Sequence, residues 1–200
     1  RATRKIGLGV MGFADMLIRL GIPYDSAEAE KTALDVMSFI DSESKAASAE
    51  LAKKRGNFPA YPGSVYDSPE TPFMRNATTT TIAPTGTISI IAGASSGIEP
   101  LFAVAYNRRV LDGTNLPELH PLFAETSKKM GFYSESLVEE VLRLGSVRDI
   151  PSVPSEVKRL FATSHDITAS WHVRIQAAFQ KFTDNAVSKT VNFSSSATLE

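Results

Sequence analysis

The stretch "ATTTTIAPTGTIS", residues 77 to 89, decides the fold of this chain. Its first half, Ala77 to Ala83, is rich in β-branched residues and predicts a strand. Its second half, Pro84 to Ser89, combines a turn, a conformationally free glycine and three hydroxyls ahead of a predicted helix start. Helices dominate the rest of the sequence, so we expect an α/β arrangement whose few strands cannot close a sheet alone.

The residues around this turn carry almost no charge. Between Asn76 and Asn107 the one charged residue is Glu99, and such a stretch belongs in an interior or a deep cleft. Within it, the residues from Pro84 to Ser89 gather backbone N–H groups and hydroxyls toward one point, which makes an anion site without cations. The alternative is a capped turn whose hydroxyls satisfy their own backbone, and the loop has no lysine of the P-loop type.

The sequence "GLGVMG", residues 7 to 12, has the Gly-x-Gly-x-x-Gly spacing of a dinucleotide-binding loop. In such a loop a buried strand comes first, but the residues that precede Ile6 are mostly polar. Apolar residues instead recur at helical spacing, which predicts a helix whose glycines let another backbone pack closely. These apolar residues are Ile6, Val10, Phe13, Leu17 and Leu20.

Turn and capping signals divide the remaining sequence into further elements. Helices are predicted over residues 25–55, 117–130, 134–144, 154–161 and 168–182, and strands over residues 102–110 and 186–193. On the last helix Trp171 shares a face with Ile175 and Phe179, which predicts a core position rather than a stacking platform.

Composition excludes several classes of function. The 200 residues are 42% hydrophobic, enough for the core of one large domain or two small ones. A net charge of -1 gives no electrostatic case for binding a nucleic acid polymer or an anionic membrane. No apolar run approaches the roughly 18 residues that span a bilayer. No signal peptide is recognisable, so a cytoplasmic setting is expected, and the first residue, Arg1 rather than Met, suggests a piece of a longer protein.

Four segments together resemble successive landmarks of ribonucleotide reductase large chains, most closely the adenosylcobalamin-dependent (class II) kind. They are "RKIGLGVMGFADML" (residues 4–17), "RNATTTTIAPTGTISIIAGASSGIEPLFAVAYNRRVLDG" (75–113), "HDIT" (165–168) and "QAAFQKFTDNAVSKTVNF" (176–193). The resemblance implies that residues 1–200 form the C-terminal part of a ten-stranded α/β barrel. It also implies that "GLGVMG" is the family's packing helix rather than a nucleotide loop.

The resemblance implies a function for the turn as well. In this family the loop after the barrel strand binds the substrate's phosphates through backbone amides and hydroxyls. The matching positions are Pro84, Thr85, Gly86, Thr87 and Ile88, with Ser89 adjacent. The implied parent is a ribonucleoside-diphosphate reductase that converts ribonucleotides to deoxyribonucleotides by radical chemistry with adenosylcobalamin. Its implied partners are the ribonucleotide substrate, the rest of the catalytic chain and a reducing dithiol protein, and a homodimer is compatible with it.

The complete absence of cysteine limits what these residues do. In the family a cysteine carries the radical and two more supply the reducing electrons, so this chain is expected to form one wall of the substrate site and to be inactive alone. No catalytic residue is therefore assigned. Glu99 belongs to the "GIEP" turn and does not match the family's catalytic glutamate.

Two other interpretations of function are considered. The first is the di-iron class of the family, which carries a pair of adjacent tyrosines near the C-terminal end of the barrel. This sequence has no Tyr-Tyr pair and its last tyrosine is Tyr133, which favours the cobalamin-dependent class. A non-catalytic phosphate-binding or structural module is the alternative outside enzymes.

Several single residues have both a functional and a structural interpretation. His165 and His172, with Asp166 beside them, could bind a metal, but their spacing of two helical turns favours capping or packing roles. Arg108 and Arg109 could contact a phosphate or the cofactor, but a salt bridge at the surface or the barrel rim is favoured. Lys189 alone indicates no function, and His120 is expected at a helix start.

Overall fold

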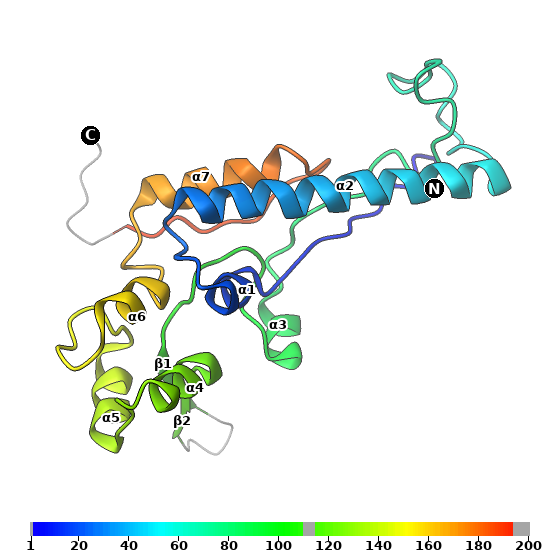
Figure 1. Ribbon diagram of the computed structural model, residues 1–200. Helices are drawn as coiled ribbons and strands as arrows, with labels where there is room; N and C mark the ends of the chain where they lie inside the picture. Colours follow the sequence, from blue (N-terminus) through cyan, green and yellow to red (C-terminus); the bar gives the residue numbers. More distant parts are fainter. Residues whose placement is uncertain (1, 110–114, 194–200) are drawn as a thin grey trace.

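The computed structural model describes residues 2–109 and 115–193, in which helices predominate (Figure 1). In chain order the elements are α1 (Phe13–Leu20), α2 (Ala27–Arg55), α3 (Gly86–Ala92), β1 (Ala105–Arg109), β2 (Asn115–Leu119), α4 (Pro121–Lys129), α5 (Glu135–Leu144), α6 (Ser155–Leu160) and α7 (Ala169–Gln180). The long helix α2 and helix α7 lie side by side along one edge of the molecule, while α4, α5 and α6 gather at the opposite end.

Three extended segments run in parallel between these helices. Leu8 pairs with Thr80, and Ile82 pairs with Val187, each as a parallel bridge. The N–H of Leu8 donates to Thr79 O at 2.8 Å, and on the other edge the residue after Val187 donates to Ile82 O at 2.9 Å. The predicted strand over residues 77–83 is therefore the middle member of a parallel set. Parallel pairing is the arrangement expected of an α/β fold.

The helix predicted to begin at Ile6 begins only at Phe13, so the assignment of "GLGVMG" to a packing helix is wrong. Residues 6–8 are extended and pair with the strand beside them. A Cβ built on Gly9 would collide with the backbone oxygen of Thr81, and one on Gly7 with that residue's side chain. The expectation of close backbone packing at the glycines is confirmed, but strand pairing, not helix packing, requires it.

Helix α2 starts two residues later than predicted, after Ser26, whose hydroxyl accepts a hydrogen bond from Ala29 N at 3.1 Å. Ala29, Ala33 and Met37, which recur at helical spacing, are fully buried in the first half. This half packs in one core cluster with residues of α1 and α7, including Phe179. The matching pattern on the last helix is confirmed for Ile175, Ala178 and Phe179, whereas Trp171 and Phe182 are only partly buried against that cluster.

The helix predicted over residues 117–130 is also corrected at its start. Strand β2 takes its first residues, since it pairs antiparallel with β1 and places Leu119 opposite Ala105. Helix α4 begins at Pro121, a favoured first helical residue because its missing N–H has no acceptor to lose there. The helix predicted over residues 134–144 is confirmed as α5, and the hydroxyl of Ser134 caps it by accepting a hydrogen bond from Leu137 N at 3.1 Å.

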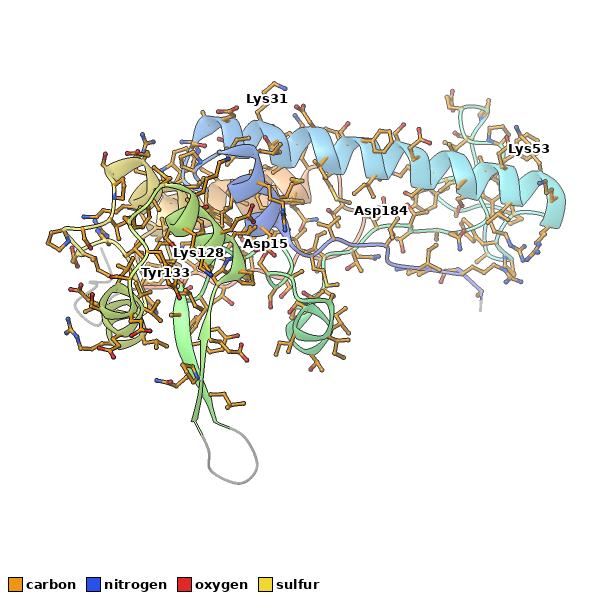
Figure 2. The ribbon with its side chains drawn as sticks, turned by 60° about the horizontal axis from the view of Figure 1, so that its bottom comes forward. Asp15, Lys31, Lys53, Lys128, Tyr133 and Asp184 are labelled. Atoms are coloured by element: carbon orange, nitrogen blue, oxygen red, sulfur yellow. The ribbon has the colours of Figure 1, made fainter. Side chains whose placement is uncertain are left out.

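Asp184 joins the C-terminal segment to the middle strand, and Figure 2 shows it close to α2. Its carboxylate accepts hydrogen bonds from Thr79 N at 2.7 Å and from the same residue's hydroxyl at 3.1 Å. The ammonium of Lys45, from α2, lies 3.3 Å away. Burial alone would raise the pKa of Asp184, but these partners hold it below its ordinary value.

No helix in residues 2–109 and 115–193 has the length and apolar content that crossing a bilayer requires.

Substituting Gly9 by alanine tests the close strand contact. The new methyl group would meet the Thr81 carbonyl, so the midpoint of thermal unfolding of the full-length protein should fall by several degrees. Gly86→Ala is the matched control, because a Cβ there meets no protein atom within 4 Å. Equal midpoints for the two variants would contradict the assigned register.

Candidate functional site

The candidate phosphate loop, Pro84–Ser89, leaves the carboxyl end of the middle strand and enters α3. Lys189 follows the neighbouring parallel segment directly after its pairing at Val187. The carboxyl ends of parallel strands meet at one edge of a sheet, so the loop and Lys189 belong to the same edge. This is the edge at which α/β proteins bind ligands.

Thr85 gives the loop its shape. It adopts a left-handed conformation with φ 57°, which is unfavourable for a β-branched residue. Its hydroxyl accepts a hydrogen bond from Gly97 N at 2.7 Å, and its carbonyl accepts the first bond of α3, from Ser89 N at 2.9 Å. A strained backbone held by a tertiary hydrogen bond is a frequent property of functional loops.

The second hydroxyl that holds the loop is that of Ser89, which is buried. It lies 2.9 Å from the hydroxyl of Ser96 and donates to Gly86 O at 3.2 Å. Two of the three predicted hydroxyls, on Thr85 and Ser89, are therefore engaged inside the protein, which is the structural role weighed as the alternative. Thr87 is exposed.

The exposed groups of the loop are mainly backbone amides. Gly86, Thr87 and Ile88 precede the first intrahelical hydrogen bond of α3, so their N–H groups have no acceptor within the helix. All three residues are exposed, and α3 has no acidic residue in its first turn. Free backbone N–H groups at a helix start without an acidic residue in its first turn suit an anion.

The expectation that residues 76–107 are buried as a whole is wrong for α3. Ile88, Ile90 and Ile91 are 55%, 61% and 80% exposed, whereas Thr80 and Ile82 of the preceding strand are buried. Burial follows strand pairing: the strand has a neighbour on each side, and α3 presents these side chains to solvent in this chain.

A partly buried ion pair lies beside the loop, between the "GIEP" turn and the C-terminal segment. The ammonium of Lys189 is 2.6 Å from Glu99 Oε2, and the other carboxylate oxygen accepts a hydrogen bond from Thr190 N at 2.7 Å. The Lys189 side chain has no exposed surface. Burial lowers the pKa of this ammonium, and Glu99 opposes the shift by favouring the charged form.

His172, from α7, completes this cluster. Its Nδ1 lies 2.7 Å from Lys189 Nζ, and its Nε2 lies 3.0 Å from the carbonyl oxygen of Ser164. An ammonium can only donate, so the ring is neutral, with the proton on Nε2 donated to Ser164. Burial lowers the pKa of His172, and the Lys189 charge adds to the shift, whereas the Ser164 carbonyl and Glu99 oppose it.

Sequence reasoning missed this cluster because its members are far apart in the chain. Lys189 and Glu99 are separated by 90 residues. One signal was present: the single charged residue in a stretch of 32 residues, a carboxylate, needs a cation if it is buried. The sequence did not indicate which cation, and Lys189 alone had suggested no function.

The remaining candidates have structural partners. Asp166 accepts hydrogen bonds from Thr163 N and Ser146 Oγ, both at 2.8 Å, while His165 is exposed. The three residues weighed as a metal site therefore do not converge, and no metal-binding group of His, Asp and Glu occurs in the described part of the chain. The side chains of Arg108 and Arg109 lie outside the described residues.

His120 precedes α4, as expected, and joins three elements (Figure 2 labels its partner, Asp15). Its Nε2 lies 3.1 Å from Asp15 Oδ1, and the other oxygen of Asp15, on α1, accepts a hydrogen bond from Ser95 N at 2.7 Å. Burial alone would raise the pKa of Asp15, but His120 and the Ser95 N–H hold it below its ordinary value. Ser95 directly precedes Ser96 and Gly97, which contact the candidate phosphate loop, so this segment is also fixed to α1.

His172 predicts a pH dependence of stability. Its pKa is lower in the folded than in the unfolded state, so its contribution is complete above about pH 6.5 and is lost as the pH falls below that value. Replacement by glutamine, which can accept from Lys189 and donate to Ser164 without titrating, should flatten this part of the stability profile.

The measurement is the thermal unfolding midpoint of the full-length protein between about pH 7.5 and 5.5. His165→Gln is the control, because that ring is exposed and its profile should match the wild type. A His172→Gln profile as steep as the wild-type profile would contradict the assigned neutral ring.

Comparison with known proteins gives this geometry a family. The family model described as "Ribonucleotide reductase, barrel domain" matches residues 1–74 and 70–200. The vitamin B12-dependent ribonucleoside-diphosphate reductases of Thermoplasma acidophilum and Mycobacterium tuberculosis are 56% and 47% identical over the whole chain, which spans 26% and 28% of their lengths. The alpha subunit of the Actinobacillus ureae class Id ribonucleotide reductase is 26% identical, with a TM-score of 0.76 over 90% of this chain and 32% of that one. The chain therefore belongs to the ribonucleotide reductase barrel-domain family.

Proposed function

We propose that residues 1–200 are the C-terminal part of the catalytic barrel of a ribonucleoside-diphosphate reductase, and that Pro84–Ser89 bind the substrate's phosphates. The observation that carries the proposal is the loop itself: the exposed residues Gly86, Thr87 and Ile88, whose N–H groups have no acceptor within α3, follow a parallel-paired segment in a turn that Thr85 fixes. Each hydrogen bond to a charged partner contributes about 1.5–3 kcal/mol, so three amides suffice to bind a phosphate.

The roles within the loop divide into binding and support. Backbone N–H groups of Gly86, Thr87 and Ile88 contact the anion, with the exposed hydroxyl of Thr87 as a further donor. Thr85 and Ser89 hold the backbone in place through Gly97 and Ser96. Pro84 limits the freedom of the chain as it leaves the strand. The loop thus orients the nucleotide, and the reaction itself needs groups from elsewhere.

The parent enzyme is proposed to use adenosylcobalamin, because two relatives that are 56% and 47% identical over the whole chain are named vitamin B12-dependent. We assign none of the described residues as a cobalt ligand. Both ring nitrogens of His172 are occupied, and Nε2 of His120 is bound to Asp15, while the buried Nδ1 of His120 has no hydrogen-bond partner. The family does not require a cobalt-binding histidine motif, so the lack of one does not count against adenosylcobalamin. When bound, the cofactor supplies the initiating radical.

The radical and the reducing electrons both require thiols, and these 200 residues have none. A ribonucleotide substrate, the rest of the catalytic chain and a dithiol protein as reductant are therefore proposed as partners. A homodimer is proposed as compatible with this assembly. The second interpretation is a non-catalytic phosphate-binding module. The relatives that match the full length of this chain are named as reductases, so they give this interpretation no support.

Gly86→Val in the full-length protein tests the phosphate loop. A Cβ at Gly86 meets no protein atom within 4 Å, so the fold should be kept. The branched side chain would stand where an anion must approach, so the dissociation constant for a nucleoside diphosphate should rise about tenfold or more. Ala92→Val, at the far end of α3, is the control. Unchanged affinity in Gly86→Val would remove the loop from the site.

The absence of cysteine gives a second test. The purified 200-residue chain, supplied with adenosylcobalamin and a dithiol, should form no deoxynucleotide, while the full-length protein should do so under the same conditions. Deoxynucleotide formation by the chain alone would refute the proposed division of labour.

A further inference from the structure

We propose that Lys189 is a positioning residue for the candidate phosphate loop, acting through Glu99 and the turn that precedes it. This inference rests on the proposed function of residues 84–89. Its physical basis is a series of short contacts from the C-terminal segment to the loop.

The first step is the ion pair. Glu99 accepts from Lys189 Nζ at 2.6 Å and from Thr190 N at 2.7 Å, so its two oxygens contact two consecutive residues. With the Lys189 side chain fully buried, little water competes for this contact. The Glu99 side chain is 24% exposed, so loss of Lys189 leaves a partly buried carboxylate without its cation, whereas loss of the Glu99 charge leaves a fully buried ammonium unpaired. Either change favours a rearrangement of the turn.

The second step connects Glu99 to the loop. Its N–H donates to Ser96 O at 2.9 Å, which closes the turn Ser96–Glu99. Inside this turn, Gly97 N donates to the Thr85 hydroxyl at 2.7 Å, and the Ser96 hydroxyl lies 2.9 Å from that of Ser89. Both hydroxyls that hold the loop are therefore bonded to the turn that Glu99 terminates.

The third step excludes direct binding by Lys189. An ammonium has three N–H donors. In Lys189 they reach Glu99 Oε2, His172 Nδ1 and the carbonyl oxygen of Thr190, at 2.6, 2.7 and 2.6 Å. No donor is left for a phosphate. Lys189 thus acts on the anion site only through the position of the backbone.

The position of Gly97 shows how little movement the loop tolerates. It has φ 47°, and a Cβ built there would lie 3.2 Å from Ala83 O, next to the start of the loop. The turn and the loop entrance are therefore packed backbone against backbone. A shift of the turn must move Thr85 with it, because their hydrogen bond spans this contact.

The experiment compares a nucleoside diphosphate with the matching nucleoside, each competing with a fluorescent nucleoside diphosphate for the full-length protein. The dissociation constant of the nucleoside divided by that of the nucleoside diphosphate is called the phosphate advantage. Lys189→Met should reduce this ratio by about 10- to 100-fold, because misplacement by about 1 Å has effects of that size. The dissociation constant of the nucleoside should stay unchanged.

Lys31→Met is the matched control. Lys31 pairs with Asp35 on α2, but both side chains are largely exposed, at 74% and 62% (Figure 2 shows Lys31 on the outer side of α2). The same substitution there should leave the phosphate advantage at its wild-type value.

Glu99→Gln keeps the inference testable if Lys189→Met does not fold. Glutamine has the same shape and still accepts from Thr190 N, but it removes the charge that binds Lys189. It should reduce the phosphate advantage in the same direction.

Three results would overturn the positioning role. The first is an unchanged ratio in both variants, and the second is an equal loss of nucleoside and nucleoside diphosphate binding, which is what general destabilisation produces. If Gly86→Val still reduces the ratio in either case, the phosphate site stands and only the role of Lys189 is wrong. The third is an unchanged ratio in Gly86→Val itself, which would refute the proposed function together with this inference.

Discussion

Hydrogen bonding on both edges of one short strand holds this chain together. The segment around Thr80 and Ile82 pairs with the first residues of the chain on one side and with residues near Val187 on the other. Helices α1, α2 and α7 cover this arrangement through a shared core. The loop at the end of the strand is placed by the same pairing, so the candidate site depends on contacts between residues that are distant in sequence.

The sequence predicted those parts of the fold that local chemistry controls. The α/β class and the helix over residues 134–144 are confirmed, and the predicted strand at residues 77–83 is extended and pairs through bridges at Thr80 and Ile82. β-branched content and a capping hydroxyl both act within a few residues. The family resemblance, drawn from four segments, is confirmed by the match to the barrel-domain model.

The errors arose where a distant partner decides the local structure. Gly7 and Gly9 fit a helical pattern, but contact with Thr81 makes them extended. The start of the predicted helix at residue 117 is instead paired with β1. Lys189 was uninformative for the same reason, since nothing in its neighbours reveals Glu99. The role of the loop in phosphate binding stays a prediction, and the structure adds that Thr85 and Ser89 support it rather than present free hydroxyls.

The separation of 90 residues between Glu99 and Lys189 has a consequence for biosynthesis. A ribosome makes the carboxylate long before it makes the ammonium, so Glu99 must stay hydrated while the intervening helices form. The counter-ion arrives only when the segment that pairs at Val187 has been made. The nascent polypeptide therefore completes the contacts that hold the candidate loop only once Lys189 is present, and premature termination before residue 189 would leave the partly buried Glu99 without its cation.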